Sequence, residues 1–326
     1  MNVAVILAGG VGSRVGADRP KQFIEVLGKP ILAYTIDVFQ KHSEIDAIEV
    51  VCHKSWKDYL NNMIKKYDLN KVKWIADGGE TFQESVLNGI NFLNDKITRE
   101  DMVLVHFGAS PFIKEDIITD CIRVCKEKGN AISTIDYFLL SGKKNITKSV
   151  EDPNNYTDTY IDRDTVACMN SPHAFNYGFI KDLYDEAIDS GVINEVEPHT
   201  TTLMYKMGKR IYFSKGSQTN IKITKKEDLD LFEGYIMQKQ EYEAKNIRGD
   251  VVLFLAEGFE ECEALLVVDL LRRANIGAVM ASISNKRTVI SSRKIPIVAD
   301  TLANAVDYSK VKMIVLPGGR LGVDNL

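Results

Sequence analysis

The stretch from Val3 to Phe23 reads VAVILAGGVGSRVGADRPKQF, and the rest of the chain is organised around it. Val3 to Leu7 form an unbroken apolar run with β-branched members, which is typical of a strand buried on both faces. Glycines in the turn that follows allow a close backbone approach and aim N–H groups at an anion. Arg14 and Lys21 then supply two cations. The stretch therefore predicts a strand that leads into a phosphate-binding loop.

Two common phosphate-binding loops do not fit this stretch. The P-loop requires Gly-Lys-Ser/Thr after its glycines, whereas Gly12 is followed by Ser13 and Arg14. The dinucleotide fingerprint G-x-G-x-x-G is missed by one residue at Gly10, Gly12 and Gly16. A plain glycine turn with two solvated cations is the alternative interpretation.

The pattern L-A-G-G-x-G-x-R followed by P-K-Q resembles the signature loop of the nucleotide-sugar pyrophosphorylase superfamily. Its Pro-Lys-Gln ending is similar to that of cytidylyltransferases acting on methylerythritol phosphate or ribitol phosphate. The resemblance covers residues 1–240 and implies a Rossmann-like α/β nucleotidyltransferase fold with a mostly parallel sheet. It also implies transfer of CMP from CTP to a polyol phosphate, with release of pyrophosphate.

The resemblance assigns roles residue by residue. It implies that Arg14, Lys21 and Lys222 contact the phosphates and the transition state, and that Arg163 and Ser171 bind the substrate. The residues it implies for nucleotide binding are Leu7, Ala8, Gly9, Gly10, Gly12, Gly79, Ser85 and His106. His106 has a second interpretation, as a hydrogen-bonded structural histidine at a strand end. Lys222 also has a second interpretation, as a solvent-exposed lysine on a strand.

Apolar patterns along the chain predict alternating strands and helices. Helical spacing marks residues 30–40, 56–67 and 115–128, and strand-like runs mark residues 45–51, 72–75 and 131–135. Residues 102–112 are expected to form the central strand and its exit loop. This alternation predicts a mostly parallel sheet with helices on both faces. Near the end of the first segment we expect a strand over residues 220–224 and a helix over residues 228–240.

A second glycine-containing segment, GGETFQESVLNG, covers residues 78–89. It resembles the second nucleotide-binding segment of these cytidylyltransferases. Gly78 and Gly79 would allow backbone approach to the cytosine, and Ser85 would lie in the first turn of a helix. A plain strand-to-helix turn explains the two glycines equally well.

The chain departs from the family pattern where polar groups are expected. The family arginine of the second segment falls at Phe82, and the family aspartate and arginine after the central strand fall at Phe107 and Ser110. His199 lies where relatives carry an acidic turn. The resemblance implies Mg²⁺, but phenylalanine offers no oxygen to a hard cation. Either the triphosphate and other groups hold the metal, or the activity is weakened or changed; the metal ligand is unknown.

Residues 137–166 form a polar stretch that resembles the β-arm through which relatives form homodimers. Arg163 would grip the substrate phosphate of the neighbouring subunit, since its planar fork binds phosphate through two hydrogen bonds. A surface arginine paired with Asp162 or Asp164 is a close alternative.

A charged linker covers residues 241–249, and after it a second series of a buried strand, a loop and a helix begins. Residues 250–326 resemble the start of the ThiJ/PfpI superfamily, which includes deglycase-like proteins, and predict a partial flavodoxin-like α/β segment. Glu263 matches the acidic residue beside the family's nucleophilic cysteine, but Cys262 does not match that cysteine. We expect no independent catalysis here. Three interpretations of this segment stay open: a dimerisation element, a degenerate fusion, or an artefact of a truncated reading frame.

Composition limits the classes of function. The chain has 326 residues, 45% hydrophobic and 26% charged, with a net charge of −4, so nothing indicates binding to nucleic acid or a membrane surface. Its five cysteines follow no ligand-like pattern, which predicts reduced thiols in the cytoplasm.

The residues leave the acceptor open between ribitol 5-phosphate and 2-C-methyl-D-erythritol 4-phosphate, with Leu-Ala-Gly-Gly slightly favouring ribitol phosphate. Two other hypotheses stay open. The first is a nucleotide-binding protein that is not a catalyst, or a nucleotidyltransferase that uses a different sugar or polyol phosphate as its acceptor. The second is a stress-linked binding module built around the C-terminal segment.

Overall fold

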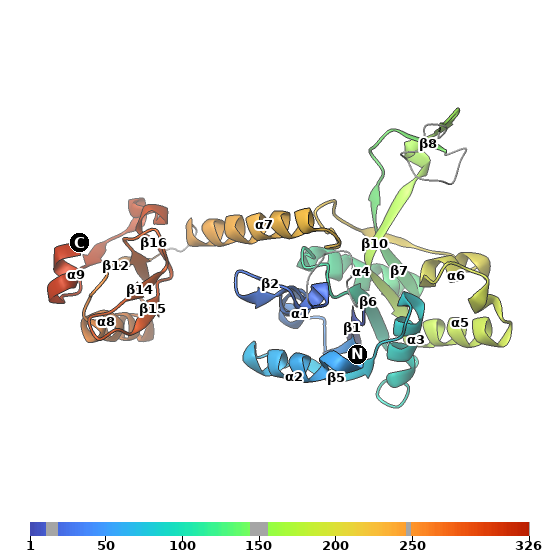
Figure 1. The fold of residues 1–326 in the computed structure, drawn as a ribbon, viewed down its shortest axis with the longest axis horizontal. Helices are drawn as coiled ribbons and strands as arrows, with labels where there is room; N and C mark the ends of the chain where they lie inside the picture. Colours follow the sequence, from blue (N-terminus) through green and yellow to red (C-terminus); the bar gives the residue numbers. More distant parts are fainter. Residues whose placement is uncertain (11–18, 144–155, 246–248, 326) are drawn as a thin grey trace. The chain divides into compact units, whose positions relative to one another are not determined.

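The computed structural model describes residues 1–10, 19–143, 156–245 and 249–325 (Figure 1). It divides into two compact units, Met1–Asp230 and Leu231–Leu326. Gly12 and Arg14 lie outside the described residues, so their predicted roles stay predictions.

A seven-stranded sheet forms the centre of the first unit, in the order β11-β7-β10-β6-β1-β4-β5. Every neighbouring pair is parallel except the two pairs of β10, which runs antiparallel to β6 and β7. The strands are β1 (Asn2–Ala8), β4 (Ala47–Cys52), β5 (Val72–Asp77), β6 (Met102–Phe107), β7 (Asn130–Asp136), β10 (Ala167–Asn176) and β11 (Phe213–Lys215).

Helices cover both faces of this sheet. The helices of the first unit are α1 (Ile31–Lys41), α2 (Lys57–Lys66), α3 (Phe82–Phe92), α4 (Glu115–Lys128), α5 (Tyr177–Asp189) and α6 (Thr200–Lys206), and α7 (Lys226–Lys245) begins there. Because side chains alternate along a strand, β1 sends Ala4 and Ile6 to one core and Val3 and Val5 to the other. Burial on both faces explains the continuous apolar run.

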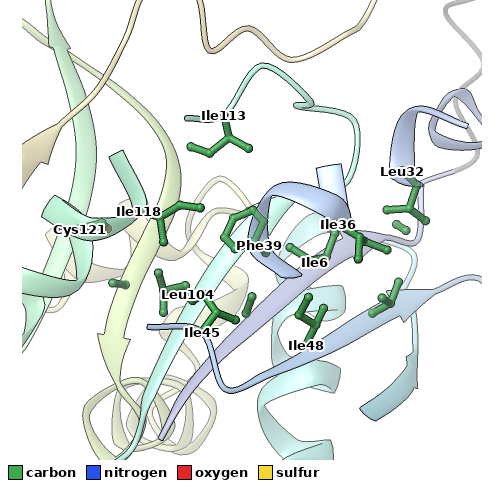
Figure 2. Packing of buried hydrophobic residues seen from close by; sticks show 14 of the residues in the cluster. Ile6, Leu32, Ile36, Phe39, Ile45, Ile48, Leu104, Ile113, Ile118 and Cys121 are labelled. Carbon is green, nitrogen blue, oxygen red and sulfur yellow. The ribbon is translucent and has the colours of Figure 1, made fainter. Parts of the chain in front are cut away.

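The first core lies between the sheet and helices α1, α2 and α4. Ile6 and Leu104 of the sheet pack with Ile36 and Phe39 of α1, as Figure 2 shows. Each fully buried large apolar side chain contributes roughly 1.5–3 kcal/mol, so this layer fixes the strand ends that carry the pocket. The second core lies beneath α3, α5 and α6.

A hairpin arm extends from the first unit between β7 and β10 (Figure 1). Its described part is the antiparallel pair β8 (Ser141–Lys143) and β9 (Thr159–Ile161). Its large apolar side chains are exposed: Phe138, Leu139, Leu140, Tyr156 and Tyr160. A second short hairpin pairs β2 (Glu25–Val26) with β3 (Lys29–Pro30).

The second unit contains a parallel four-stranded sheet in the order β16-β13-β12-β17. Its elements are β12 (Val251–Leu255), α8 (Glu261–Arg273), β13 (Ala278–Ser282), β14 (Thr288–Ile290), β15 (Pro296–Val298), β16 (Thr301–Leu302), β17 (Met313–Val315) and α9 (Arg320–Asn325). Glu263 of α8 accepts a 2.5 Å hydrogen bond from the Gly318 amide.

The predicted fold class is confirmed, including the arm and the smaller α/β segment. Helix α4 has the predicted bounds. The predicted strand over residues 220–224 is wrong: these residues form no strand with any described part of the chain, and Ile223 N donates one hydrogen bond to Ala109 O. Helix α7 runs past the predicted end at Gln240 to Lys245.

Candidate active site

A pocket of about 230 Å³ lies at the carboxyl ends of β1 and β6, where ligands bind in open α/β sheets. Three segments beyond these strands complete it: the start of η2 (Lys21–Phe23), the β5–α3 loop and the segment before α7. The lining residues are Leu7, Gly9, Gly10, Lys21, Gln22, Gly79, Glu80, Thr81, Phe82, Ser85, Phe107, Ala109, Lys222 and Thr224.

Glycines allow the two loops of the pocket to touch. A Cβ atom on Gly78 would lie 3.0 Å from the Gly9 Cα, and one on Gly79 would lie 2.3 Å from the Glu84 Cβ. The β1 and β5 loops therefore meet through their backbones. Gly10 has open space where a Cβ would point, so its surface faces the pocket rather than a neighbour.

Ser85 holds the β5–α3 loop in shape. Its Oγ accepts a 3.0 Å hydrogen bond from the Gly79 amide and donates a 3.0 Å bond to Thr81 O. Thr81 caps α3 in a capping box with Glu84. Ser85 lines the pocket as expected, but its hydroxyl is engaged within the loop.

Gln22 clamps the first loop, a role that was not predicted from the sequence. Its Nε2 donates to Ala8 O at 2.7 Å and to Gly10 O at 2.8 Å, and the side chain is buried. Both amide hydrogens thus hold the carbonyls on either side of Gly9. The Pro-Lys-Gln motif contained this residue, but nothing in its spacing shows which carbonyls the amide reaches.

Two lysines converge on the pocket from distant parts of the chain. Lys21 Nζ donates a 2.8 Å hydrogen bond to Ile223 O, which ties the first loop to the segment before α7. The ammonium of Lys222 lies 3.7 Å from the centroid of the Phe107 ring. Asp228 anchors the same segment by accepting from Thr224 N at 2.6 Å.

Aromatic rings occupy the positions where the resemblance led us to expect charges. The ring centroids of Phe82 and Phe107 are 5.3 Å apart, and those of Phe82 and His199 are 5.0 Å apart. Phe82 and Phe107 therefore give the pocket two aromatic lining residues near the end of β6.

His106 lies beneath the pocket and does not line it. It is fully buried, its Nε2 is 3.0 Å from Ser110 O, and its ring contacts Phe39. Because a carbonyl only accepts, Nε2 carries the proton. Burial lowers the pKa of His106 to about 4, which keeps the ring neutral. This placement fits the structural interpretation of His106.

The two predicted substrate-binding residues also lie outside the pocket lining. Arg163 lies in the arm, where its Nη1 donates to Phe138 O at 3.2 Å. Ser171 is buried in β10, and its carbonyl accepts from Asn220 Nδ2 at 2.6 Å. Both contacts lie within one chain, so the substrate-binding roles of Arg163 and Ser171 stay predictions.

The described residues do not offer a side-chain cage for a metal ion. None of their His, Cys, Asp and Glu side chains gather in groups of three or more that could ligate one. Glu80 is the only carboxylate among the described lining residues, and Phe107 brings a ring to the end of β6. A magnesium ion held by several protein carboxylates does not fit these residues.

A glycine-backbone pocket with two lysines at this edge of a mostly parallel α/β sheet suits the phosphates of a nucleotide, and the relatives of this chain are nucleotidyltransferases. The profile of the 2-C-methyl-D-erythritol 4-phosphate cytidylyltransferase family matches residues 2–238. The chain belongs to this family. Residues 250–326 match the DJ-1/PfpI family, as the sequence indicated.

Curated relatives and solved structures agree with this assignment. A ribitol-5-phosphate cytidylyltransferase of Lacticaseibacillus paracasei is 38% identical over 74% of this chain and 100% of that protein. A 2-C-methyl-D-erythritol 4-phosphate cytidylyltransferase of Clostridium novyi is 36% identical over 72% of this chain and 96% of that protein. The 4-diphosphocytidyl-2C-methyl-D-erythritol synthase structure from Anaerococcus prevotii has a TM-score of 0.59 at 25% identity, covering 72% of this chain and 96% of that one.

Among the helices that the structure describes, none combines the length and the apolar character needed to cross a bilayer.

Proposed function

We propose that this chain transfers the cytidylyl group of CTP to a polyol phosphate. A phosphate oxygen of the acceptor forms a bond to the α-phosphorus of CTP, the bond to the β-phosphate oxygen breaks, and pyrophosphate leaves with that electron pair. The products are a CDP-polyol and pyrophosphate. The convergence of Lys21 and Lys222 on a glycine-walled pocket is the observation that carries the proposal.

No side-chain nucleophile is needed for this reaction. The protein has to align two polyanions and stabilise charge that builds on the α-phosphate. Lys21 and Lys222 supply positive charge at the pocket, and the predicted role of Arg14 would add a third. The backbone from Leu7 to Gly10, with Gly79, would hold the nucleotide.

Ribitol 5-phosphate is the first acceptor to test. The ribitol-5-phosphate cytidylyltransferases among the relatives are 36–38% identical to this chain, and the methylerythritol-phosphate enzymes are 34–36% identical. The glycine pair Gly9-Gly10 favours the same choice. 2-C-methyl-D-erythritol 4-phosphate is the second acceptor.

We propose that magnesium would reach the pocket bound to the phosphates of CTP. Mg²⁺ commonly keeps several waters and uses substrate phosphates with one or two carboxylates. Glu80 is the described lining residue that could meet such an ion. We assign no catalytic step to it.

The arm supports a homodimer, with Arg163 reaching a neighbour's substrate phosphate. The arm also carries exposed apolar side chains such as Leu139 and Leu140. The cytoplasm is the proposed location, because all five cysteines are free thiols, as is usual for proteins of that compartment.

The test is pyrophosphate release with CTP and Mg²⁺, run in parallel with each of the two acceptors. We expect release with one of them. Lys21→Ala should lower the rate on the order of 10²–10³-fold, the usual loss when a pre-organised charge or donor is removed. Lys126→Ala is the matched control, since this lysine pairs with Glu44 on the exposed face of α4.

The main alternative is a nucleotide-binding protein that is not a catalyst, favoured by Phe107 and Ser110 at positions where relatives carry charges. It predicts CTP binding without pyrophosphate release from either acceptor. An unchanged rate in Lys21→Ala would contradict the proposed mechanism.

A further inference from the structure

The ammonium of Lys222 lies over the face of an aromatic ring. Its Nζ is 3.7 Å from the centroid of the Phe107 ring, closer than the 4.2 Å between Lys96 Nζ and the Phe92 ring elsewhere in the first unit. Both distances are well within the range of a cation–π interaction. Phe107 and Lys222 both line the pocket.

The backbone around Lys222 is fixed, but its side chain is long. Ile223 N donates to Ala109 O at 2.8 Å, and Ile223 O accepts from Lys21 Nζ at 2.8 Å. These bonds hold the main chain at Ile223, next to Lys222. A lysine stem is a flexible four-carbon chain, so the main chain alone does not set where the ammonium lies. The face of the Phe107 ring supplies one such restraint.

The Phe107 ring is itself held by other rings. Phe82, the first residue of α3, contacts it with a centroid distance of 5.3 Å and an interplanar angle of 47°. His199, before α6, contacts Phe82 in turn at a centroid distance of 5.0 Å. Three elements therefore contribute one row of rings, which we call the ring row: Phe107, Phe82 and His199.

A ring suits this position in a pocket for a polyanion. The Phe107 ring leaves this position without the carboxylate that the family pattern carries there. The ring face attracts a cation through its quadrupole and adds no net charge. We propose that Phe107 is a positioning residue: its ring face holds the Lys222 ammonium where the ligand's phosphates meet it, and the ring row fixes that face. This inference rests on the proposed function of the pocket.

The experiment measures binding of CTP and of inorganic triphosphate by calorimetry. Phe107→Leu keeps apolar volume but removes the ring face. We expect it to weaken binding about three- to thirtyfold, the range that a cation–π contact predicts. Phe107→Tyr keeps the face and should bind as the wild type does. Phe92→Leu removes a cation–π contact outside the pocket and should leave binding unchanged.

Two further measurements separate positioning from simple packing. Fluorinated phenylalanines at position 107 weaken the ring face without altering its shape, so affinity should fall in step with the number of fluorines. In a Lys222→Ala background, Phe107→Leu should cause no further loss, because the pair acts as a unit. Additive losses, or unchanged binding through the fluorine series, would overturn the proposal even if Phe107→Leu folds poorly.

These outcomes are distinct from failure of the proposed function. A wild-type chain that binds triphosphate but releases no pyrophosphate would overturn the transferase proposal, and the binding series would still decide the role of Phe107. A wild-type chain that binds neither ligand would overturn both.

Discussion

Glu49 is a buried carboxyl group in the middle of β4. Its side chain has no exposed surface, and neither oxygen has a hydrogen-bond partner in the part of the chain that the structure describes. A Cβ on Gly89 of α3 would lie 3.3 Å from Glu49 Oε2, so the helix packs closely over it. Burial raises the pKa of Glu49 well above its ordinary value, and the charge of Lys96 opposes this only in part.

We predict that Glu49 makes the protein less stable as pH rises. The unfolded chain releases this proton near pH 4.5 and the folded chain releases it only at higher pH, so the unfolded state binds fewer protons in between. The contribution of Glu49 to the free energy of unfolding is therefore fully present below pH 4.5. It falls as pH rises to the pKa of the folded state, by about 1.4 kcal/mol for each pH unit between the two pKa values. Glu49→Gln should remove this dependence, as measured by urea unfolding at pH 5 and pH 8.

The wild type has to be compared with the variant because His106 changes the pH dependence of stability in the opposite direction to Glu49. Its pKa is lowered to about 4, so its contribution to stability is lost as pH falls from 6.5 towards 4. Subtracting the Glu49→Gln profile from the wild-type profile cancels the histidine. Equal pH slopes in the two proteins would show that Glu49 is already ionised in the folded state.

At the scale of elements, the arm leads to a prediction about assembly. Leu139 and Leu140 are 53% and 84% exposed, an unusual state for neighbouring leucines in a hairpin. If the arm forms the dimer contact, replacing both leucines by Asp should lower the mass in light scattering from twice 36.6 kDa to 36.6 kDa. Leu266→Asp on α8, which is 58% exposed, is the control and should not change the mass. A wild-type chain of 36.6 kDa would contradict the dimer.

Elements with a local signal were predicted well from the sequence. The β1 run is continuously apolar and the α4 helix carries a helical period, and α4 ends at Gly129 in a left-handed conformation that favours glycine. The 220–224 segment alternates Ile221, Lys222 and Ile223 like a strand. Its described contact with the sheet region is a single backbone hydrogen bond from Ile223 N to Ala109 O, so the alternation was misleading there.

Contacts between distant residues could not be predicted in the same way. Phe82, Phe107 and His199 looked like separate departures from a motif, and no spacing in the sequence shows that their rings touch. The amide of Gln22 is a similar case, since its two carbonyl partners depend on the shape of the loop.

At the scale of the whole molecule, we predict that residues 250–326 are dispensable for transfer. The described residues that line the pocket all belong to the first unit, and 240 residues of this chain match a relative over its full length. A chain of residues 1–245, which keeps all of α7, should retain the kcat and KM of the full chain. A fragment of residues 250–326 should release no pyrophosphate. Loss of activity in the 1–245 chain would point to a role for the second unit.

The hydrogen bond from Lys21 to Ile223 O joins residues 202 positions apart. During synthesis the glycine loop leaves the ribosome early, but the carbonyl that receives Lys21 emerges only after nearly the whole first unit. A nascent chain therefore has its sheet and first loop before it has a closed pocket. Nucleotide binding should begin abruptly at the chain length that frees the start of α7, so truncated products of interrupted translation would not bind CTP.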